Sequence, residues 1–193
     1  EIAGHHVVEH LRQLAKPLAG LRLVHINSTK AGGGVAEILH KMIPLMRELG
    51  LDVQWEVISG EPRFYECTKG FHTAMQGNRV NLTDVQLRSY EQTNRTYAEA
   101  SGATLREADV VLVHDPQPAA LIASIGDRKG KWVWRCHIDA SHPFRPVWRY
   151  LRNFVKEFDA SIFSIAPFSQ RLPHPVYLIA PSIDPLHEKN IQL

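Results

Sequence analysis

The stretch Leu23-Val24-His25-Ile26-Asn27-Ser28, followed by Ala31-Gly32-Gly33-Gly34-Val35-Ala36-Glu37-Ile38, decides the fold expected for this chain. It has the pattern of a β-strand, a glycine loop and the first turn of a helix. Consecutive glycines let a ligand approach the backbone closely, and the helix directs free N–H groups at the loop. Because anions bind there, Gly32, Gly33 and Gly34 are candidates for a phosphate- or donor-facing loop. A tight turn that only packs the helix against the strand fits the same glycines equally well.

The loop matches neither of the two common nucleotide motifs. The dinucleotide fingerprint requires a third glycine three residues after Gly34, where this chain has Glu37. A P-loop requires Gly-Lys followed by Ser or Thr, and no such triplet follows. The class of ligand therefore has to be inferred from the rest of the chain.

The chain has 193 residues, which suits one domain with a sizeable core, here taken as residues 1–193. The net charge is only +2, and lysines and arginines form no run, so we expect no nucleic-acid partner. The eleven histidines lack zinc-helix spacing, and we expect neither a metal nor a cofactor. Two distant cysteines, no leader pattern and no apolar run near 18 residues predict a reduced, cytoplasmic protein without a membrane partner.

Strand and helix patterns alternate along the chain. Strands are expected over residues 21–27, 52–58, 110–113, 132–138, 160–165 and 176–179. Helices are expected over 5–16, 35–49, 116–124 and about 147–158, with two more between 61 and 102. This rhythm predicts an α/β fold with a doubly wound, mostly parallel, Rossmann-like sheet. Ligands of such sheets bind at the carboxyl ends of the strands.

Polar side chains follow the expected strands at those ends. His114, Asp115 and Gln117 follow one strand, Arg135 and His137 share a face of the next, and Asp139 follows it. Each has a structural explanation as well: the aspartates could cap turns, and the histidines could bond to backbone in the core. Their convergence on the glycine-loop edge favours a binding or catalytic site over six separate structural roles.

Four segments together resemble the retaining glycosyltransferases of family 4, which have the GT-B fold, and among them the trehalose glycosyltransferring synthases. The segments are Gly32-Gly33-Gly34-Val35-Ala36-Glu37-Ile38-Leu39-His40, His114-Asp115-Pro116-Gln117-Pro118, Arg135-Cys136-His137-Ile138-Asp139 and Ala180-Pro181-Ser182-Ile183-Asp184-Pro185. Each motif is weak alone, but four in this order are fairly specific. The resemblance runs from about residue 8 to residue 193.

The resemblance implies a hexosyltransferase that joins glucose from a nucleotide diphosphate glucose to free glucose, giving α,α-trehalose reversibly and with retention. His137 would be the catalytic residue beside the transferred glucose. His114, Asp115, Gln117, Arg135 and Asp139 would bind the acceptor sugar, and Gly32, Gly33 and Gly34 would face the donor phosphate. The implied ligands are glucose, trehalose and the nucleotide sugar.

The family has a second domain, which supplies the groups that hold the donor, and its motifs do not follow Asp184 in this sequence. We therefore expect an N-terminal acceptor domain that is inactive alone and whose partner is the C-terminal domain. Two other functions fit the sequence: a trehalose phosphorylase of the same family, and a stand-alone sugar- or nucleotide-binding module. A homodimer is also compatible with the sequence.

Overall fold

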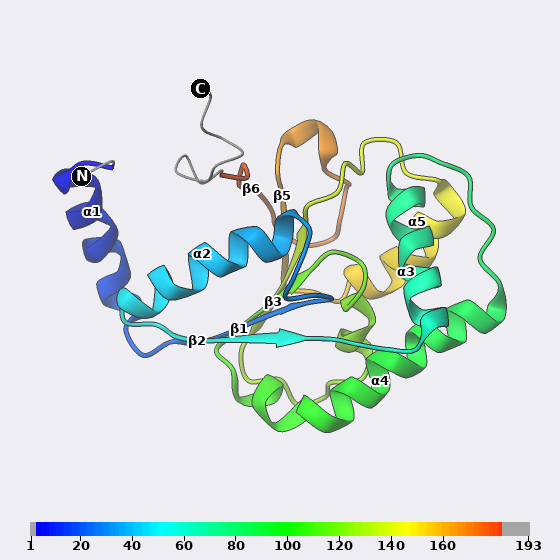
Figure 1. The fold of residues 1–193 in the computed structure, drawn as a ribbon, viewed down its shortest axis with the longest axis horizontal. Helices are drawn as coiled ribbons and strands as arrows, with labels where there is room; N and C mark the ends of the chain where they lie inside the picture. Colours follow the sequence, from blue (N-terminus) through cyan, green and yellow to red (C-terminus); the bar gives the residue numbers. More distant parts are fainter. Residues whose placement is uncertain (1–2, 183–193) are drawn as a thin grey trace.

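The computed structural model describes residues 3–182, so Ile183, Asp184 and Pro185 of the last motif lie outside the described residues. Six parallel strands form one sheet in the order β2-β1-β3-β4-β5-β6 (Figure 1). Their bounds are β1 Arg22–Asn27, β2 Asp52–Val57, β3 Val110–His114, β4 Lys131–Cys136, β5 Ala160–Phe163 and β6 Val176–Leu178. All six strands therefore end at the same edge of the sheet. The predicted α/β, doubly wound, mostly parallel sheet is confirmed.

Helices cover the two faces of this sheet. Helix α2 (Gly34–Glu48) lies above the sheet in Figure 1, and α4 (Asp84–Glu107) lies below it, while α3 (Pro62–Met75) and α5 (Arg145–Val155) lie together at the right of the view. The α2 face holds a small apolar core that includes Leu23, Leu39 and Ile43. The other face holds the main core, which is built around Trp132, Trp134 and the helices α3, α4 and α5. Side chains of successive strand residues alternate between these two cores.

Helix α1 (His5–Ala15) stands at one end of the molecule (Figure 1), and among its residues only Ala15 is buried. A short 3-10 turn, η1 (Lys16–Leu18), connects it to β1. Gly20 and Gly50 both have positive φ, and the Gly20 N–H donates to the Gly50 carbonyl at 2.8 Å. This contact closes the amino-terminal edge of the sheet between the start of β1 and the end of α2.

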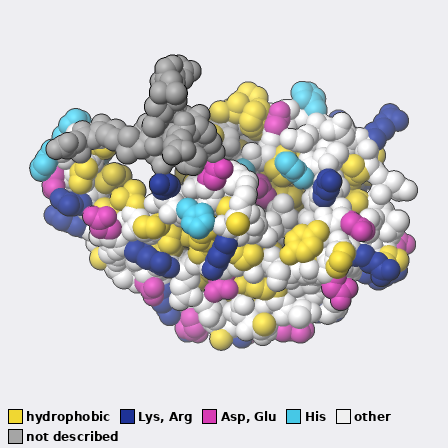
Figure 2. Space-filling model, viewed as in Figure 1, with side chains coloured by type: hydrophobic (Ala, Val, Ile, Leu, Met, Phe, Trp, Pro, Cys, Tyr) yellow, Lys and Arg dark blue, Asp and Glu magenta, His cyan; other side chains and the backbone are white. Residues whose placement is uncertain are grey.

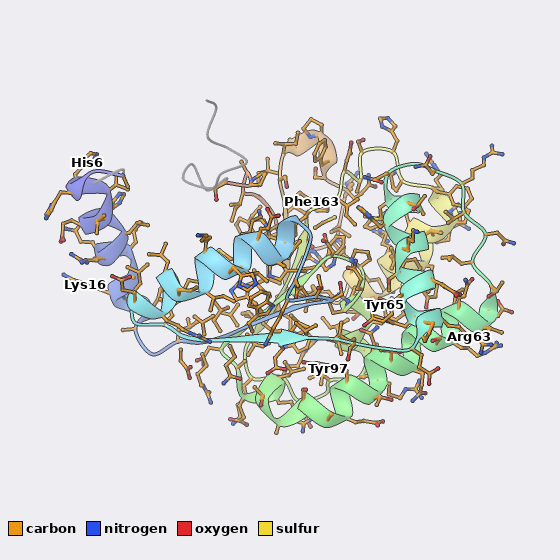
Figure 3. All side chains as sticks on the ribbon, viewed as in Figure 1. His6, Lys16, Arg63, Tyr65, Tyr97 and Phe163 are labelled. Atoms are coloured by element: carbon orange, nitrogen blue, oxygen red, sulfur yellow. The ribbon has the colours of Figure 1, made fainter. Side chains whose placement is uncertain are left out.

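The helices predicted near 5–16 and 35–49 are confirmed, and Pro44 lies inside α2 without ending it. The predicted capping box also forms. Thr83 Oγ accepts from the Gln86 N–H, and the Gln86 side chain accepts from the Thr83 N–H. Helix α4 then continues to Glu107, past the limit at residue 102 set from the sequence. Midway along it, Tyr97 lies between α4 and β2 (Figure 3), where its hydroxyl donates to Glu56 at 2.7 Å.

Three predicted elements are shorter in the structure. The helix expected over 116–124 is only a 3-10 segment, η2 (Ala119–Ala123), because side chains of α4 bond to the carbonyls of Pro116 and Gln117 and hold the residues before it in a turn. The strand expected over 132–138 ends at Cys136, which leaves His137 and Asp139 in the following loop. The strand expected over 160–165 ends at Phe163, before the 3-10 turn η3 (Ala166–Phe168).

Among residues 3–182, no helix is both long and apolar enough to cross a membrane. On the face that Figure 2 shows, lysine and arginine side chains are interspersed with aspartates and glutamates. This mixing agrees with the small net charge of +2.

Candidate functional site at the carboxyl edge of the sheet

The glycine loop connects β1 to α2 at this edge. Gly32 and Gly33 have φ of +75° and +82°, a backbone region that glycine occupies without strain. Gly33 is the N-cap of α2, and no side chain caps the helix. A Cβ built at Gly32, Gly33 or Gly34 would meet nothing within 4 Å. A ligand could therefore approach this glycine segment at the start of α2 closely, as a phosphate at a helix N-terminus does.

Side chains of β1, β2 and α2 form hydrogen bonds that fix the start of the glycine loop. Asn27 Oδ1 accepts from the Trp55 indole N–H at 2.9 Å, and Asn27 Nδ2 donates to the Thr29 carbonyl at 2.7 Å. His40 of α2 bonds to the Lys30 carbonyl at 2.7 Å and meets the Trp55 ring edge-on. These bonds fix the loop relative to β1, β2 and α2 without using any side chain in the glycine segment itself.

We expect Gly33→Ala to lower the free energy of unfolding by about 1–3 kcal/mol, because its φ of 82° and ψ of 151° lie in a backbone region that is essentially confined to glycine. Gly34→Ala is the matched control, since Gly34 is helical and has the same open surroundings. Its expected effect is neutral or stabilising by up to about 1 kcal/mol. Urea unfolding of the two variants measures the difference. Equal losses would contradict the conformation assigned to Gly33.

Asp115 is the most constrained residue of the edge. It has a φ of +61°, its N–H donates to the Arg135 carbonyl at 2.8 Å, and its own carbonyl accepts from the Trp134 indole at 2.9 Å. Its carboxylate Oδ1 accepts the His137 N–H at 2.7 Å. Burial raises the pKa of Asp115 to about 7, although the His137 N–H and the Arg135 charge act in the opposite direction. Asp115 thus joins the end of β3 to the loop after β4.

Two residues of α4 hold the turn that follows Asp115. The Tyr90 hydroxyl donates to the Pro116 carbonyl at 2.8 Å and accepts from the Ala120 N–H at 3.1 Å. Asn94 Nδ2 donates to the Gln117 carbonyl at 3.1 Å. Both side chains are fully buried, so the main core fixes the position of the turn directly.

Three histidines form a hydrogen-bonded chain across the sheet toward the same edge. His25 Nδ1 lies 2.9 Å from His114 Nε2, and His114 Nδ1 lies 3.0 Å from His137 Nε2. The rings stack at centroid distances of 5.2 Å. His25 and His114 are buried on the α2 face, whereas His137 is half-buried. We refer to His25, His114 and His137 as the histidine chain.

The histidine chain is kept neutral by its surroundings. Burial lowers the pKa of His25 to about 4, and burial together with the Arg135 charge lowers that of His137 to about 4. Burial, the neighbouring histidines and Arg135 all lower the pKa of His114. At neutral pH each ring therefore has one N–H and one bare nitrogen, which is what two consecutive N–H···N bonds require.

The other predicted site residues lie near this cluster but have different surroundings. Arg135 is buried, and its guanidinium donates to the Ile179 carbonyl beyond β6 at 2.9 Å. Asp139 accepts the Ser141 N–H at 2.8 Å, which is the turn role foreseen as its structural alternative. Gln117 is held through its backbone by Asn94. Of the predicted set, the contacts join His114, Asp115, Arg135 and His137 most closely.

The sequence reasoning missed His25, Asn27, Trp55, Tyr90 and Asn94 as parts of this site. His25 carried a signal, because it shares a strand face with Asn27, directly before the glycine loop. Its link to His114 could not be predicted, because it depends on the register between β1 and β3. Among residues 3–182, no group of three or more His, Cys, Asp or Glu is placed to hold a metal ion.

A hollow of about 920 Å³ lies elsewhere, between the end of β2 and the helices α3 and α4. It is lined by Arg63, Arg88 and Arg95, among other residues, and Figure 3 shows Arg63 at the start of α3. None of its lining residues belongs to the histidine chain or the glycine loop. The candidate site is therefore an open edge of the sheet and not this hollow.

Comparisons with known proteins point to one family. A family model described as "Trehalose synthase, N-terminal domain" matches residues 25–170. The trehalose synthase of Thermococcus litoralis is 44% identical over all of this chain and 47% of its own length. The trehalose phosphorylase of Pleurotus pulmonarius is more distant, with 30% identity over 81% of this chain and 23% of its own length.

Among solved structures, a UDP-forming α,α-trehalose-phosphate synthase from Burkholderia xenovorans, in complex with glucose 6-phosphate, superposes with a TM-score of 0.57 at 19% identity. The match covers 76% of this chain and 41% of that one, and it shows a shared fold. The chain spans about half the length of the trehalose synthases it matches.

Proposed function

Because the chain belongs to the trehalose synthase N-terminal domain family, we propose that it is the acceptor-binding half of a retaining glucosyltransferase. In this proposal the complete enzyme joins glucose from a nucleotide diphosphate glucose to free glucose and forms α,α-trehalose. The family match over residues 25–170 is the observation that carries it. The architecture of the edge supports it, since sugar ligands of parallel α/β sheets bind at the strand ends.

The proposed chemistry follows from the groups at the edge. The uncrowded glycine segment at the start of α2 suits the donor phosphate, whose negative charge grows as the glucose leaves. His137 is held through its N–H by Asp115 and through its ring by His114, which suits a hydrogen bond to the transferred sugar. The carboxylate of Asp115 and the side chains of Gln117 and Asp139 are the proposed partners of acceptor hydroxyls.

In the complete enzyme, we propose that the C-terminal domain holds the nucleotide and closes over this edge. The chain alone would then bind the acceptor sugar but turn over no donor. Trehalose phosphorylase relatives, at 30% identity, make phosphorolysis the second activity to test.

The experiment has a binding arm and an activity arm. Crystals grown with glucose or with trehalose are expected to show sugar within hydrogen-bond distance of His137 or Asp115. The chain incubated with glucose and with uridine or adenosine diphosphate glucose is expected to form no trehalose. Trehalose formation would overturn the proposed inactivity, and phosphate-dependent cleavage of trehalose would favour the phosphorylase. Sugar bound only away from the sheet edge would overturn the proposed site.

A further inference from the structure

The two N–H···N bonds of the histidine chain can both be donated away from His25 or both toward it. The buried ring, His25, sets which of these two directions is adopted. His25 Nε2 is buried and has no hydrogen-bond partner among the described residues. Each of the two N···N contacts can have its proton on either nitrogen, but the three rings must agree if both bonds are to form. Only two arrangements of neutral rings satisfy both bonds: all protons on Nε2, or all protons on Nδ1.

The two arrangements differ at the ends of the chain. With all protons on Nε2, the His25 Nε2–H would be a buried donor without an acceptor, and orphaned buried N–H groups are rare in folded proteins. With all protons on Nδ1, His25 donates to His114 and His114 donates to His137. The remaining proton then lies on His137 Nδ1, which has no hydrogen bond to the described residues.

We propose that His25 and His114 are positioning residues that fix the proton of His137 on Nδ1, so that this ring presents an N–H donor at the sheet edge. The register of the strands makes this possible. His25 pairs with Leu112, two residues before His114, and His114 pairs with Arg135, two residues before His137. Each step thus moves one strand across and two residues toward the edge, and all three rings remain on the same face.

The charged groups around the chain support a neutral donor at its end. Arg135 repels an added proton on both His114 and His137. The Asp115 carboxylate contacts the backbone of His137 and not its ring, since Oδ1 accepts the backbone N–H. A neutral Nδ1–H suits a sugar oxygen that must stay hydrogen-bonded while the charge at the reacting carbon changes. This ligand role rests on the proposed function, whereas the proton positions do not.

The test places the protons directly. In the ¹⁵N-histidine-labelled chain at pH 7.5, long-range ¹H–¹⁵N correlation spectra are expected to show His25, His114 and His137 with bare Nε2 and protonated Nδ1. Protonated Nε2 on His114 or His137 would overturn the proposal. The wild-type spectrum alone decides this, so the result does not depend on any variant folding.

Two variants of His25 test the role of the buried end. His25→Asn retains a side-chain N–H near the position of Nδ1 and is expected to keep a single Nδ1–H form of His114 and His137. His25→Asp presents only acceptor oxygens near the position of Nδ1 and is expected to reverse the direction, which places the protons of His114 and His137 on Nε2. Retention of a single Nδ1–H form in His25→Asp would show that His25 does not set the direction.

Glucose affinity links the proton positions to the ligand. If the Nδ1–H form binds glucose, the Kd of His25→Asp rises by the reciprocal of the measured Nδ1–H fraction, or about tenfold if a tenth of the molecules keep that form. If His25 had a purely structural role, the glucose Kd would not follow the measured Nδ1–H fraction. An unchanged Kd despite reversed proton positions would overturn the ligand role. Absence of glucose binding in the wild type would overturn the proposed function while the spectra still decide the proton positions.

Discussion

Asp115→Ala is expected to lower the free energy of unfolding by about 2–4 kcal/mol. The substitution removes the carboxylate that accepts the His137 N–H at 2.7 Å, which leaves this N–H without its acceptor. It also places an alanine at a φ of +61°, in the left-handed region that aspartate tolerates better. Urea denaturation at pH 7.5 measures the loss, and the backbone amide signal of His137 reports its altered position.

Two further substitutions separate these causes. Asp115→Gly removes the carboxylate but accepts the positive φ, so its loss is expected to be about 1–2 kcal/mol smaller than that of Asp115→Ala. Asp115→Asn retains an acceptor oxygen and tolerates the same φ, so it is expected to stay within about 1 kcal/mol of the wild type. If Asp115→Asn were as destabilising as Asp115→Ala, the carboxylate charge and not the hydrogen bond would hold this junction.

Lowering the pH from 6.5 to 4 is expected to remove several kcal/mol of stability, because histidines buried neutral in the fold take up protons in the unfolded chain. The folded pKa of His25 and of His137 is about 4, and that of His114 is also lowered, whereas unfolded histidines titrate near 6.5. The unfolded state therefore binds more protons in this window. Each histidine contributes a slope of up to about 1.4 kcal/mol per pH unit.

Asp115 has the opposite effect on how the free energy of unfolding changes with pH, so it provides the matched control. Its folded pKa is about 7, so between pH 4 and 7 the folded state holds a proton that the unfolded state has released. Asp115→Asn is thus expected to make the loss of stability on acidification steeper, and His25→Leu to make it shallower. Urea titrations every half pH unit measure these slopes. A stability that stays flat from pH 6.5 to 4 would contradict a buried neutral histidine chain.

Much of the fold was predictable because its signals are local. The aliphatic run Val110 to Val113 predicted a strand covered on both faces, and in the structure Val111 and Val113 are buried while Val110 and Leu112 are half-buried. The Thr83 and Gln86 pair marked the start of α4. The helix expected over 116–124 was wrong, because the prolines and the bonds from Tyr90 and Asn94 fix a tighter turn. Those bonds come from α4, more than 20 residues away in the sequence, and no local pattern reveals them.

The sequence predicted which residue types form the candidate site and at which edge of the sheet they lie. It did not predict which side chains contact one another. Strand ends identified His114, Asp115, Arg135 and His137, since a parallel sheet brings its carboxyl ends together. The histidine chain needed the offset of two residues between neighbouring strands, which only the register provides. His25 was missed for this reason. The left-handed backbone of Asp115 was equally invisible, because aspartate occurs in many turns without it.

The central claim is that the carboxyl edge bearing the glycine loop and the histidine chain binds the acceptor sugar. The most direct test titrates the ¹⁵N-labelled chain with glucose and with trehalose and follows the amides of Gly32, Gly33, Gly34 and Asp115 and the ring of His137. We predict saturable shifts confined to this edge. A folded spectrum whose edge signals do not move, or shifts only near Arg63 and Arg88 in the hollow along α4, would contradict the claim.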